Sequence, residues 1–364
     1  MRLTARQAVQ VSAVILTVIV SAHVAPIPSA ATASAAVTAR TAILLEVGSA
    51  TCVETRDRAP FIVGAAIQNC VIGSLPAPAS PIGQRDAGGA SYWGTPVWRD
   101  EFEGNRVDPN KWNVRSRTDL GLGIDAGIPD PGQVAVSDGM LHIRGDWLDT
   151  PQSRPPSRTG VSILTHKTGY LDHRRLRTND IVPYEQSYGR WEMRAKVPTG
   201  PRTLGSLAAF WLRNSQSGEI DIMESWGYGD IPRNQRPGTS TTTVHTKTDG
   251  SGVKKFWPLE EELARKLGTS TLPSVHLDFH VWALEYTPAR FTMMYDGFEV
   301  FTTTPAQSPD FWNPQYFGSP LHVRLNLHVG PSERYWGLPN PSQRELTQPL
   351  DFQVDYIRIW AMPG

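Results

Sequence analysis

The sequence predicts an all-β fold for residues 91–364: a two-sheet antiparallel sandwich of the jelly-roll kind with a concave cleft. Short strand-like runs recur through this segment, and Gly, Pro, Asn and Asp separate them. The composition agrees, because 31 Gly, 30 Pro, 12 Trp and 10 Tyr combine many turn formers with many aromatic residues. Only residues 258–267, PLEEELARKL, suggest a helix.

Period-two alternation identifies the strands most clearly in residues 190–197 and 321–329. In 321–329 the odd-numbered residues are apolar, while the opposite face carries His322, Arg324, Asn326 and His328. In 190–197 the apolar face opposes Arg190, Glu192, Arg194 and Lys196. The remaining expected strands are 134–146, 206–212, 218–225, 239–248, 279–288, 290–300 and 352–361.

The first 90 residues have the features of an export signal followed by an extension with a linker, and we do not expect them to form a large core. Residues 1–33 have a basic start, an apolar run and an Ala31-Thr32-Ala33 cleavage pattern, which is typical of a signal peptide; an uncleaved anchor is the alternative. Residues 34–90 form an N-terminal extension that ends in a Pro/Gly-rich linker. Its Cys52 and Cys70 could pair in an oxidising compartment, with a structural role, and the pairing stays open.

One acidic run, Gly218-Glu219-Ile220-Asp221-Ile222-Met223-Glu224, stands out among the expected strands. Strict alternation would put Glu219 and Asp221 on one face but bury Glu224 in the core. Burying an unpaired carboxylate costs several kcal/mol or shifts its pKa strongly. A β-bulge around Ile222–Met223 would return Glu224 to the face of the other two acids, so the sequence predicts a bulge there.

Three carboxylates on one face repel one another, and this pattern suits glycoside hydrolysis better than a structural role. A retaining glycosidase needs a nucleophilic carboxylate and a carboxylic acid on either side of the scissile bond. A third acid between them raises the pKa of the acid that must stay protonated. The alternatives are a solvated acidic strand or a calcium site, but calcium prefers loop oxygens to a strand rich in Ile and Met.

The acidic run resembles the E-x-D-x-x-E signature of glycoside hydrolase family 16, in its bulged, laminarinase-like branch. Further segments match the family in the same order: VWRDEFEGNRVDPNKWN at 97–113, SYGRWEMRAKVPTG at 187–200, FHVWALEYTPARFTMMYDG at 279–297, then LNLHVG and VDYIRIW. The resemblance covers about 91–364 and implies a concanavalin-like jelly roll.

By this resemblance Glu219 is the nucleophile, Asp221 the modulator between the acids and Glu224 the acid/base. The resemblance also implies that His245 lies in the cleft and that Glu192 and Arg194 hold sugar on the nonreducing side. From its position two residues after Glu224, Trp226 should share the cleft face and could stack on a sugar ring. Asn326 completes the expected substrate-binding residues. Trp211 and Trp282 are interpreted as core residues.

The family often binds one structural calcium ion away from the chemistry, and the matching positions here are Glu101, the Gly139 carbonyl and Asp355. Turn and salt-bridge roles are the alternative for Glu101 and Asp355. No cofactor is expected for catalysis. Two segments depart from the family: SLAAFW at 206–211 lacks the tryptophan that precedes the family's P-A-F-W, and NSQS at 214–217 lacks a tryptophan commonly found just before the acidic motif. Both tryptophans usually offer stacking surface for glucose units. These departures leave the identity of the substrate open, and they affect the expected type of reaction less.

The expected function is therefore a secreted, extracellular retaining endo-β-glucanase acting on β-1,3- or mixed β-1,3/1,4-glucan. Three alternatives remain: a hydrolase of agar or another galactan, a transglycosylase, and a noncatalytic glycan-binding protein. The 35 basic and 35 acidic residues balance, so the charge gives no indication of electrostatic binding to nucleic acid or to an anionic membrane. We expect a monomer whose partner is the polysaccharide, with no membrane association after signal cleavage.

Overall fold

The structure is a computed structural model of the 364-residue chain. It describes residues 41–47, 50–56, 92–123, 125–173, 184–200, 202–203, 205–227, 238–246, 257–270, 274–330, 341–346 and 349–363. The predicted signal segment 1–33, the linker-like stretch 75–90 and Cys70 lie outside these residues. The signal peptide and the Cys52–Cys70 pairing therefore stay predictions. Among the described residues, no helix combines the length and the apolar character needed to cross a bilayer.

The chain divides into two compact units, Met1–Val71 and Ile72–Gly364. In the first unit, β1 (Thr41–Val47) pairs with β2 (Ala50–Arg56) as an antiparallel hairpin that places Cys52 opposite Leu45. The predicted boundary at 90/91 falls later than the division at 71/72. Residues 72–91 lie outside the described part of the chain, so that boundary stays a prediction.

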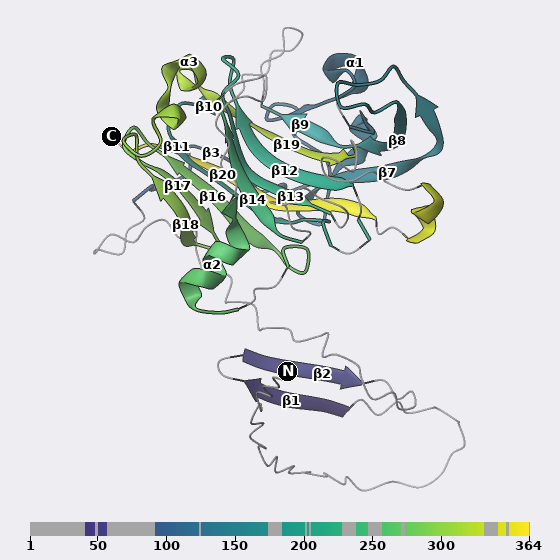
Figure 1. The fold of residues 1–364 in the computed structure, drawn as a ribbon, viewed down its shortest axis with the longest axis horizontal. Helices are drawn as coiled ribbons and strands as arrows, with labels where there is room; N and C mark the ends of the chain where they lie inside the picture. The colour runs from purple at the N-terminus through teal and green to yellow at the C-terminus, as the bar shows by residue number, and fades with distance from the viewer. Residues whose placement is uncertain are drawn as a thin grey trace, which may run out of the picture. The chain divides into compact units, whose positions relative to one another are not determined.

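The second unit contains two sheets, and the predicted two-sheet β-sandwich is confirmed (Figure 1). The eight-stranded sheet runs in the order β15-β14-β13-β12-β19-β9-β4, with β10 also paired to β19. The ten-stranded sheet runs β18-β17-β16-β11-β20-β7-β8-β5, with β3 on β20 and β6 on β7. Nearly all neighbours are antiparallel; β5 and β8 are parallel.

The strands of the eight-stranded sheet are β4 (Asn113–Val114), β9 (Tyr170–Asp172), β10 (Glu185–Gln186), β12 (Ser206–Arg213), β13 (Glu219–Trp226), β14 (Ser240–His245), β15 (Trp257–Pro258) and β19 (Leu321–Val329). The strands of the ten-stranded sheet are β3 (Trp98–Asp100), β5 (Gly127–Pro129), β6 (Val134–Ser137), β7 (Met140–Ser153), β8 (Ile163–Thr168), β11 (Gly189–Lys196), β16 (His280–Tyr286), β17 (Phe291–Tyr295), β18 (Phe298–Thr303) and β20 (Leu350–Ala361).

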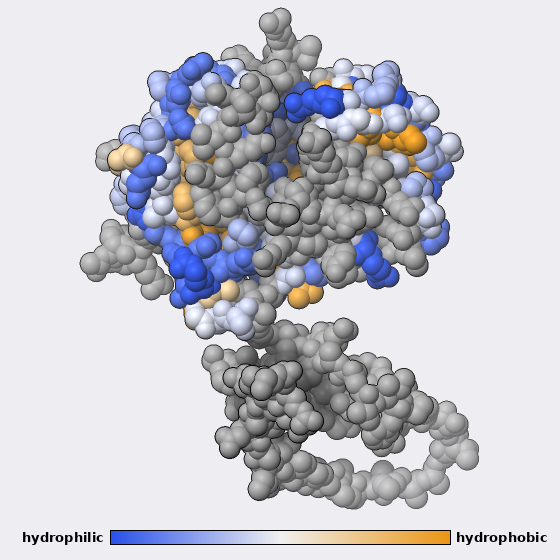
Figure 2. Space-filling model, in the orientation of Figure 1, coloured by the Kyte–Doolittle hydropathy of each residue, from blue (hydrophilic) through white to orange (hydrophobic). Residues whose placement is uncertain are grey.

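Short helices connect these strands: α1 (Arg117–Leu120), η1 (Pro131–Gln133), α2 (Leu259–Leu267), η2 (Pro309–Trp312), α3 (Pro314–Phe317) and η3 (Pro341–Leu346). The predicted helix at 258–267 is confirmed as α2. It ends at Gly268, whose left-handed φ of 68° closes the last turn. Figure 2 shows the hydrophilic side of α2 in blue, while Leu259 and Leu263 on its other side are buried in the core.

The core lies between the two sheets, as the alternation patterns require. Inward-facing residues of β12, β13 and β19 pack with those of β11, β16, β17 and β20, and they form one large buried cluster. Trp282 belongs to this cluster and is fully buried, which confirms its predicted core role. The polar residues of β12, β13 and β19 consequently project from the outer side of the eight-stranded sheet.

The turn between β12 and β13 fixes the start of the acidic strand. Its Asn214 side chain accepts hydrogen bonds from the backbone N–H groups of Gln216 and Gly218, at 3.0 and 2.9 Å. A Cβ on Gly218 would lie 2.2 Å from the carbonyl oxygen of Tyr316, so only glycine fits there. Ser217 has a φ of 71°, a left-handed conformation that a non-glycine residue adopts at a cost.

Two neighbouring substitutions in this turn should therefore change stability in opposite directions. We expect Gly218→Ala to lower the free energy of unfolding by about 1–3 kcal/mol, because the new methyl group overlaps backbone. Ser217→Gly should raise it by about 1 kcal/mol, because glycine relieves the left-handed strain. Urea unfolding midpoints measure both. A stabilised Gly218→Ala would contradict the close approach to Tyr316.

Candidate active site

The bulge in the acidic strand is present where the sequence predicts it. Between β12 and β13 the register passes from Phe210↔Met223 to Trp211↔Asp221, which leaves Ile222 without a partner. The pairing of β13 with β14 shifts in the same interval, between Asp221 and Glu224. As a result Ile222 and Met223 are both buried in the core, and Glu224 returns to the side of Glu219 and Asp221.

We call the outer side of the eight-stranded sheet that carries these three acids the acidic face. Strand register places its residues in rows, since directly paired residues point to the same side. His245, Glu219 and Arg213 form one row, and Thr243, Asp221, Trp211 and Arg324 form the next. The third row contains Thr241, Glu224, Ala209, Asn326 and Tyr170.

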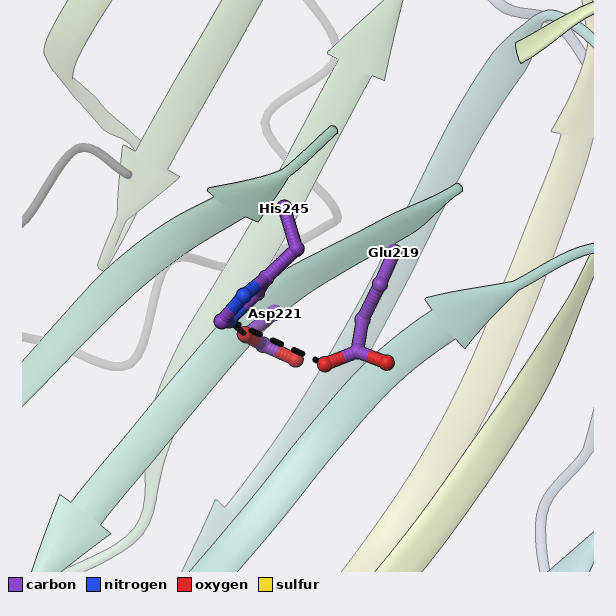
Figure 3. A group of neighbouring side chains, drawn as sticks. All are labelled: Glu219, Asp221 and His245. Atoms are coloured by element: carbon purple, nitrogen blue, oxygen red, sulfur yellow. Dashed lines mark ion pairs between the residues drawn. The ribbon is translucent and has the colours of Figure 1, made fainter. Parts of the chain in front are cut away.

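His245 lies over the first two acids (Figure 3). Its Nε2 atom is 3.1 Å from Asp221 Oδ2 and 3.7 Å from Glu219 Oε1. Burial lowers the pKa of His245, but the hydrogen bond and charge of Asp221, together with Glu219 and Glu224, outweigh burial and raise this pKa to about 9. His245 is therefore an imidazolium at neutral pH.

Glu224 is the acid that stays protonated. Burial and the charges of Asp221 and Glu219 raise its pKa to about 8, while His245 and a hydrogen bond from Thr243 oppose the shift. The Thr243 hydroxyl donates to Glu224 Oε2 at 2.9 Å. A carboxyl group that carries a proton at neutral pH can act as a general acid.

Glu219 is surrounded by more positive charge than Glu224. Burial and the charge of Asp221 raise the pKa of Glu219 overall, while the charges of His245, Arg213 and Arg324 oppose this shift. Arg213 donates a hydrogen bond to Glu219 Oε2. More positive groups therefore favour the ionised form of Glu219 than favour that of Glu224.

Among the described residues, Glu219, Asp221 and His245 are the one group of side chains arranged closely enough to hold a metal ion. Their negative charge is already balanced by Arg213 and by the imidazolium of His245. A further cation would meet positive charge there. The alternative of a metal site on this strand is therefore disfavoured, and the arrangement suits acid–base and nucleophilic chemistry.

The remaining predicted substrate-binding residues of this sheet do lie on the acidic face. Asn326 is fully buried, and its Oδ1 accepts a hydrogen bond from the Trp211 indole at 2.7 Å. Trp226 shares the face as predicted, but it is only 1 % exposed and packs on Leu207 and Ala209. Trp226 is therefore a buried packing residue of this face, and its ring does not offer an open surface for stacking on a sugar.

The prediction that Glu192 and Arg194 bind sugar beside the acids is wrong for this structure. Both lie on β11, between β16 and β20 of the ten-stranded sheet, and they face its outer side. Glu192 is fully buried and accepts hydrogen bonds from Arg190 and Tyr356. Alternation shows that the two residues share a face, but it does not show which sheet the strand joins.

The carboxylates expected to bind calcium are engaged by arginines instead. Glu101 receives two hydrogen bonds from Arg358, at 2.9 and 2.8 Å, and Asp355 pairs with Arg194 at 2.6 Å. Gly139, with a φ of 73°, forms the turn between β6 and β7. As placed, these side chains do not fit a calcium ion. The calcium site stays a prediction.

Sequence reasoning missed three residues of the acidic face. Trp211 was interpreted as core, but it lies on this face, and the Arg324 guanidinium stacks 4.7 Å from its ring centroid. Alternation in 321–329 had placed Arg324 on the correct face without assigning it a role. Arg213 gave no signal, because its pairing with Glu219 depends on the hairpin register.

Comparisons with known proteins agree with this geometry. The sequence model of glycosyl hydrolases family 16 matches residues 176–348, which include all three acids. This matched segment belongs to glycosyl hydrolases family 16. As a member of this family it is a glycoside hydrolase, and its two sheets form the jelly roll that the sequence predicts.

Two relatives illustrate the extent of the similarity. The chain is 29% identical to a "Beta-glucanase" of Rhodothermus marinus over 298 residues, covering 77% of this chain and 90% of the relative. It is 27% identical over 290 residues to "Glucan endo-1,3-beta-glucosidase A1" of Niallia circulans, of which it spans only 37%. The fold resembles the catalytic domain of a Thermotoga petrophila laminarinase, with a TM-score of 0.55 and 22% identity over 74% of this chain and 98% of that one.

The pKa values of the acidic face predict the pH dependence of this glycoside hydrolase. General-acid catalysis needs protonated Glu224, so the rate should fall as the pH rises through about 8. Because the charge of Asp221 raises the pKa of Glu224, Asp221→Asn should move this basic limb to lower pH. Profiles of kcat/KM against pH for the two proteins measure the shift. A basic limb that stays in place would contradict the coupling.

Proposed function

We propose that the chain is a secreted retaining endo-β-glucanase that hydrolyses β-1,3- or mixed β-1,3/1,4-glucan by double displacement. The observation that carries this proposal is the division of roles on the acidic face. Glu224 has a pKa of about 8 and keeps its proton, while Glu219 is paired with Arg213 and lies near His245. The glucan preference is supported by the names of the two relatives, which both describe enzymes acting on β-glucans.

In the first step Glu224 donates its proton to the glycosidic oxygen while a carboxylate oxygen of Glu219 attacks the anomeric carbon. The glycosidic bond breaks, the leaving sugar departs as an alcohol, and a glycosyl ester forms on Glu219. Glu224, now ionised, takes a proton from water, and the resulting hydroxide attacks the same carbon from the opposite face. The ester bond to Glu219 breaks, and the product keeps the original anomeric configuration.

Asp221 and His245 maintain this division of roles between turnovers. Asp221 lies between the two glutamates along the strand, and its charge raises the pKa of Glu224, which favours the protonated acid. His245 binds Asp221 through Nε2, so the modulating carboxylate is held in place from the neighbouring strand. Secretion is part of the proposal and depends on the signal-like residues 1–33, and a monomeric state is proposed with it.

The decisive experiment is to follow the first-formed anomer by proton NMR during hydrolysis. Laminarin, lichenan, agarose, carrageenan and xyloglucan are compared, with a Glu219→Gln variant as the background control. We expect β-anomers from laminarin or lichenan. An initial α-anomer would exclude the double displacement, and activity confined to agarose or carrageenan would replace the substrate. Products longer than the substrate would indicate transglycosylation.

A further inference from the structure

The hairpin that begins the acidic strand places an arginine directly on the carboxylate of Glu219. Arg213 is the last residue of β12 and pairs in register with Glu219, the first residue of β13. The Asn214 side chain fixes the turn between them, since its amide nitrogen donates to the carbonyl oxygens of Tyr316 and Ser319 at 2.7 and 3.1 Å. The contact between Arg213 and Glu219 is thus anchored by a tethered turn.

The two oxygens of Glu219 face different partners. Oε2 accepts a hydrogen bond from Arg213 Nη1 on one neighbouring strand, and Oε1 faces His245 on the other, at 3.7 Å. His245 is closer to Asp221, at 3.1 Å. Within the described part of the chain, Arg213 is the side chain that donates a hydrogen bond to Glu219. Its guanidinium therefore sets the orientation of this carboxylate.

The other positively charged groups near Glu219 form their shortest contacts with other residues. Arg324 stacks on Trp211 and donates to His322 Nε2 and to the Tyr170 hydroxyl, each at 3.1 Å. His328 on the same strand pairs with Asp125 at 2.5 Å. Asp221, on the strand of Glu219 itself, adds negative charge, whereas Glu224 keeps its proton. Arg213 donates a hydrogen bond to Glu219 and still has 27% of its side chain exposed.

We propose that Arg213 is a positioning residue that holds Glu219 ionised and oriented for attack on the anomeric carbon. This inference rests on the proposed function, because it acts through the nucleophile. A guanidinium does not lose its proton in the working pH range, so its charge on Glu219 is constant. Arg213 shares a row of the acidic face with Glu219 and lies two rows from Glu224, so its effect falls mainly on the nucleophile.

The selectivity gives Arg213→Met a signature in the pH profile of kcat/KM. Removing the guanidinium raises the pKa of Glu219, so the acidic limb should move to higher pH. On that limb kcat/KM should fall about tenfold or more, the effect of losing an adjacent opposite charge. The basic limb should stay in place, because it reports Glu224. A uniform loss with both limbs unmoved would overturn the proposal.

Arg213→Lys separates charge from orientation. Lysine keeps the positive charge but lacks the planar fork, so the acidic limb should return to its wild-type position while kcat stays reduced. An Arg213→Lys profile identical to that of Arg213→Met would contradict the role of the charge. Arg265→Met is the matched control, since Arg265 lies on α2, is 69% exposed and pairs with Glu262. This variant should reproduce the wild-type profile.

A direct titration makes the inference independent of turnover. The side-chain carboxyl carbon of Glu219 is followed by carbon-13 NMR in wild type and in Arg213→Met, and it is assigned by its loss in Glu219→Gln. The midpoint should rise in Arg213→Met, and an unchanged midpoint would overturn the inference. If the wild type hydrolyses no polysaccharide, the proposed function fails while this titration still decides the role of Arg213.

Discussion

Glu219→Ala should reduce kcat on a β-glucan by roughly 10⁴- to 10⁶-fold, the scale observed when a catalytic nucleophile is removed. No other carboxylate of the acidic face can replace it. Asp221 is paired with His245, and Glu224 carries the proton that the leaving group needs. The fold should persist, because Glu219 begins its strand and projects from the sheet rather than into the core.

Azide rescue would identify Glu219 as the nucleophile rather than as a residue needed for binding. In Glu219→Ala, azide fits the space that the carboxylate leaves and attacks an activated aryl β-glucoside from the same side. A single displacement inverts the anomeric carbon, so the product should be the α-glycosyl azide. Glu103→Ala, at an exposed position, is the control and should retain the wild-type rate. Wild-type activity in Glu219→Ala would refute the assignment.

Glu224→Ala should have the second-largest effect, and the effect should depend on the leaving group. On polysaccharide we expect a loss of about 10²- to 10⁴-fold in kcat, the usual contribution of general acid catalysis. An aryl glucoside with an acidic phenol needs no proton to leave, so its first step should be nearly unchanged. The second step lacks its base, and the glycosyl-enzyme on Glu219 should accumulate. A burst of phenol in stopped-flow absorbance measures this accumulation.

Azide should again distinguish the two glutamates in this variant. It attacks the accumulated glycosyl-enzyme from the side that Glu224 occupied, and two inversions give the β-glycosyl azide. The basic limb near pH 8 should disappear from the profile, since the group that causes it is gone. An α-product from Glu224→Ala, or equal losses on polysaccharide and aryl glucoside, would contradict the assigned roles.

The bulge shows how far the sequence determines the candidate site. Strand parity alone would have buried Glu224 among Ile and Met side chains, and the free-energy cost of that burial predicted an irregularity at Ile222–Met223. The structure has the irregularity there. The same local logic correctly predicted the helix at Leu259–Leu267 and the polar face of 321–329. Each prediction depended on neighbours within one segment.

Predictions that depended on the pairing and packing of segments far apart in the chain were less accurate. Alternation in 190–197 correctly separates Glu192 and Arg194 from the core side, yet β11 joins the ten-stranded sheet, away from the acids. Trp211 reads as core from its apolar neighbours, but the bulge register brings it beside Asp221. Trp226 faces the correct side, but packing on Leu207 and Ala209 removes it from solvent.

The family resemblance implied the roles of the two glutamates, whereas the pattern of the sequence by itself determined the two-sheet β class and the acidic strand with its bulge. These follow from side-chain alternation and from the cost of burying charge, which are local properties of a strand. Only the tertiary structure decided that Arg213 contacts Glu219, that Arg324 covers Trp211, and that β11 lies in the other sheet. Strand order and register arise from packing between segments far apart in the chain, and no single segment contains that information.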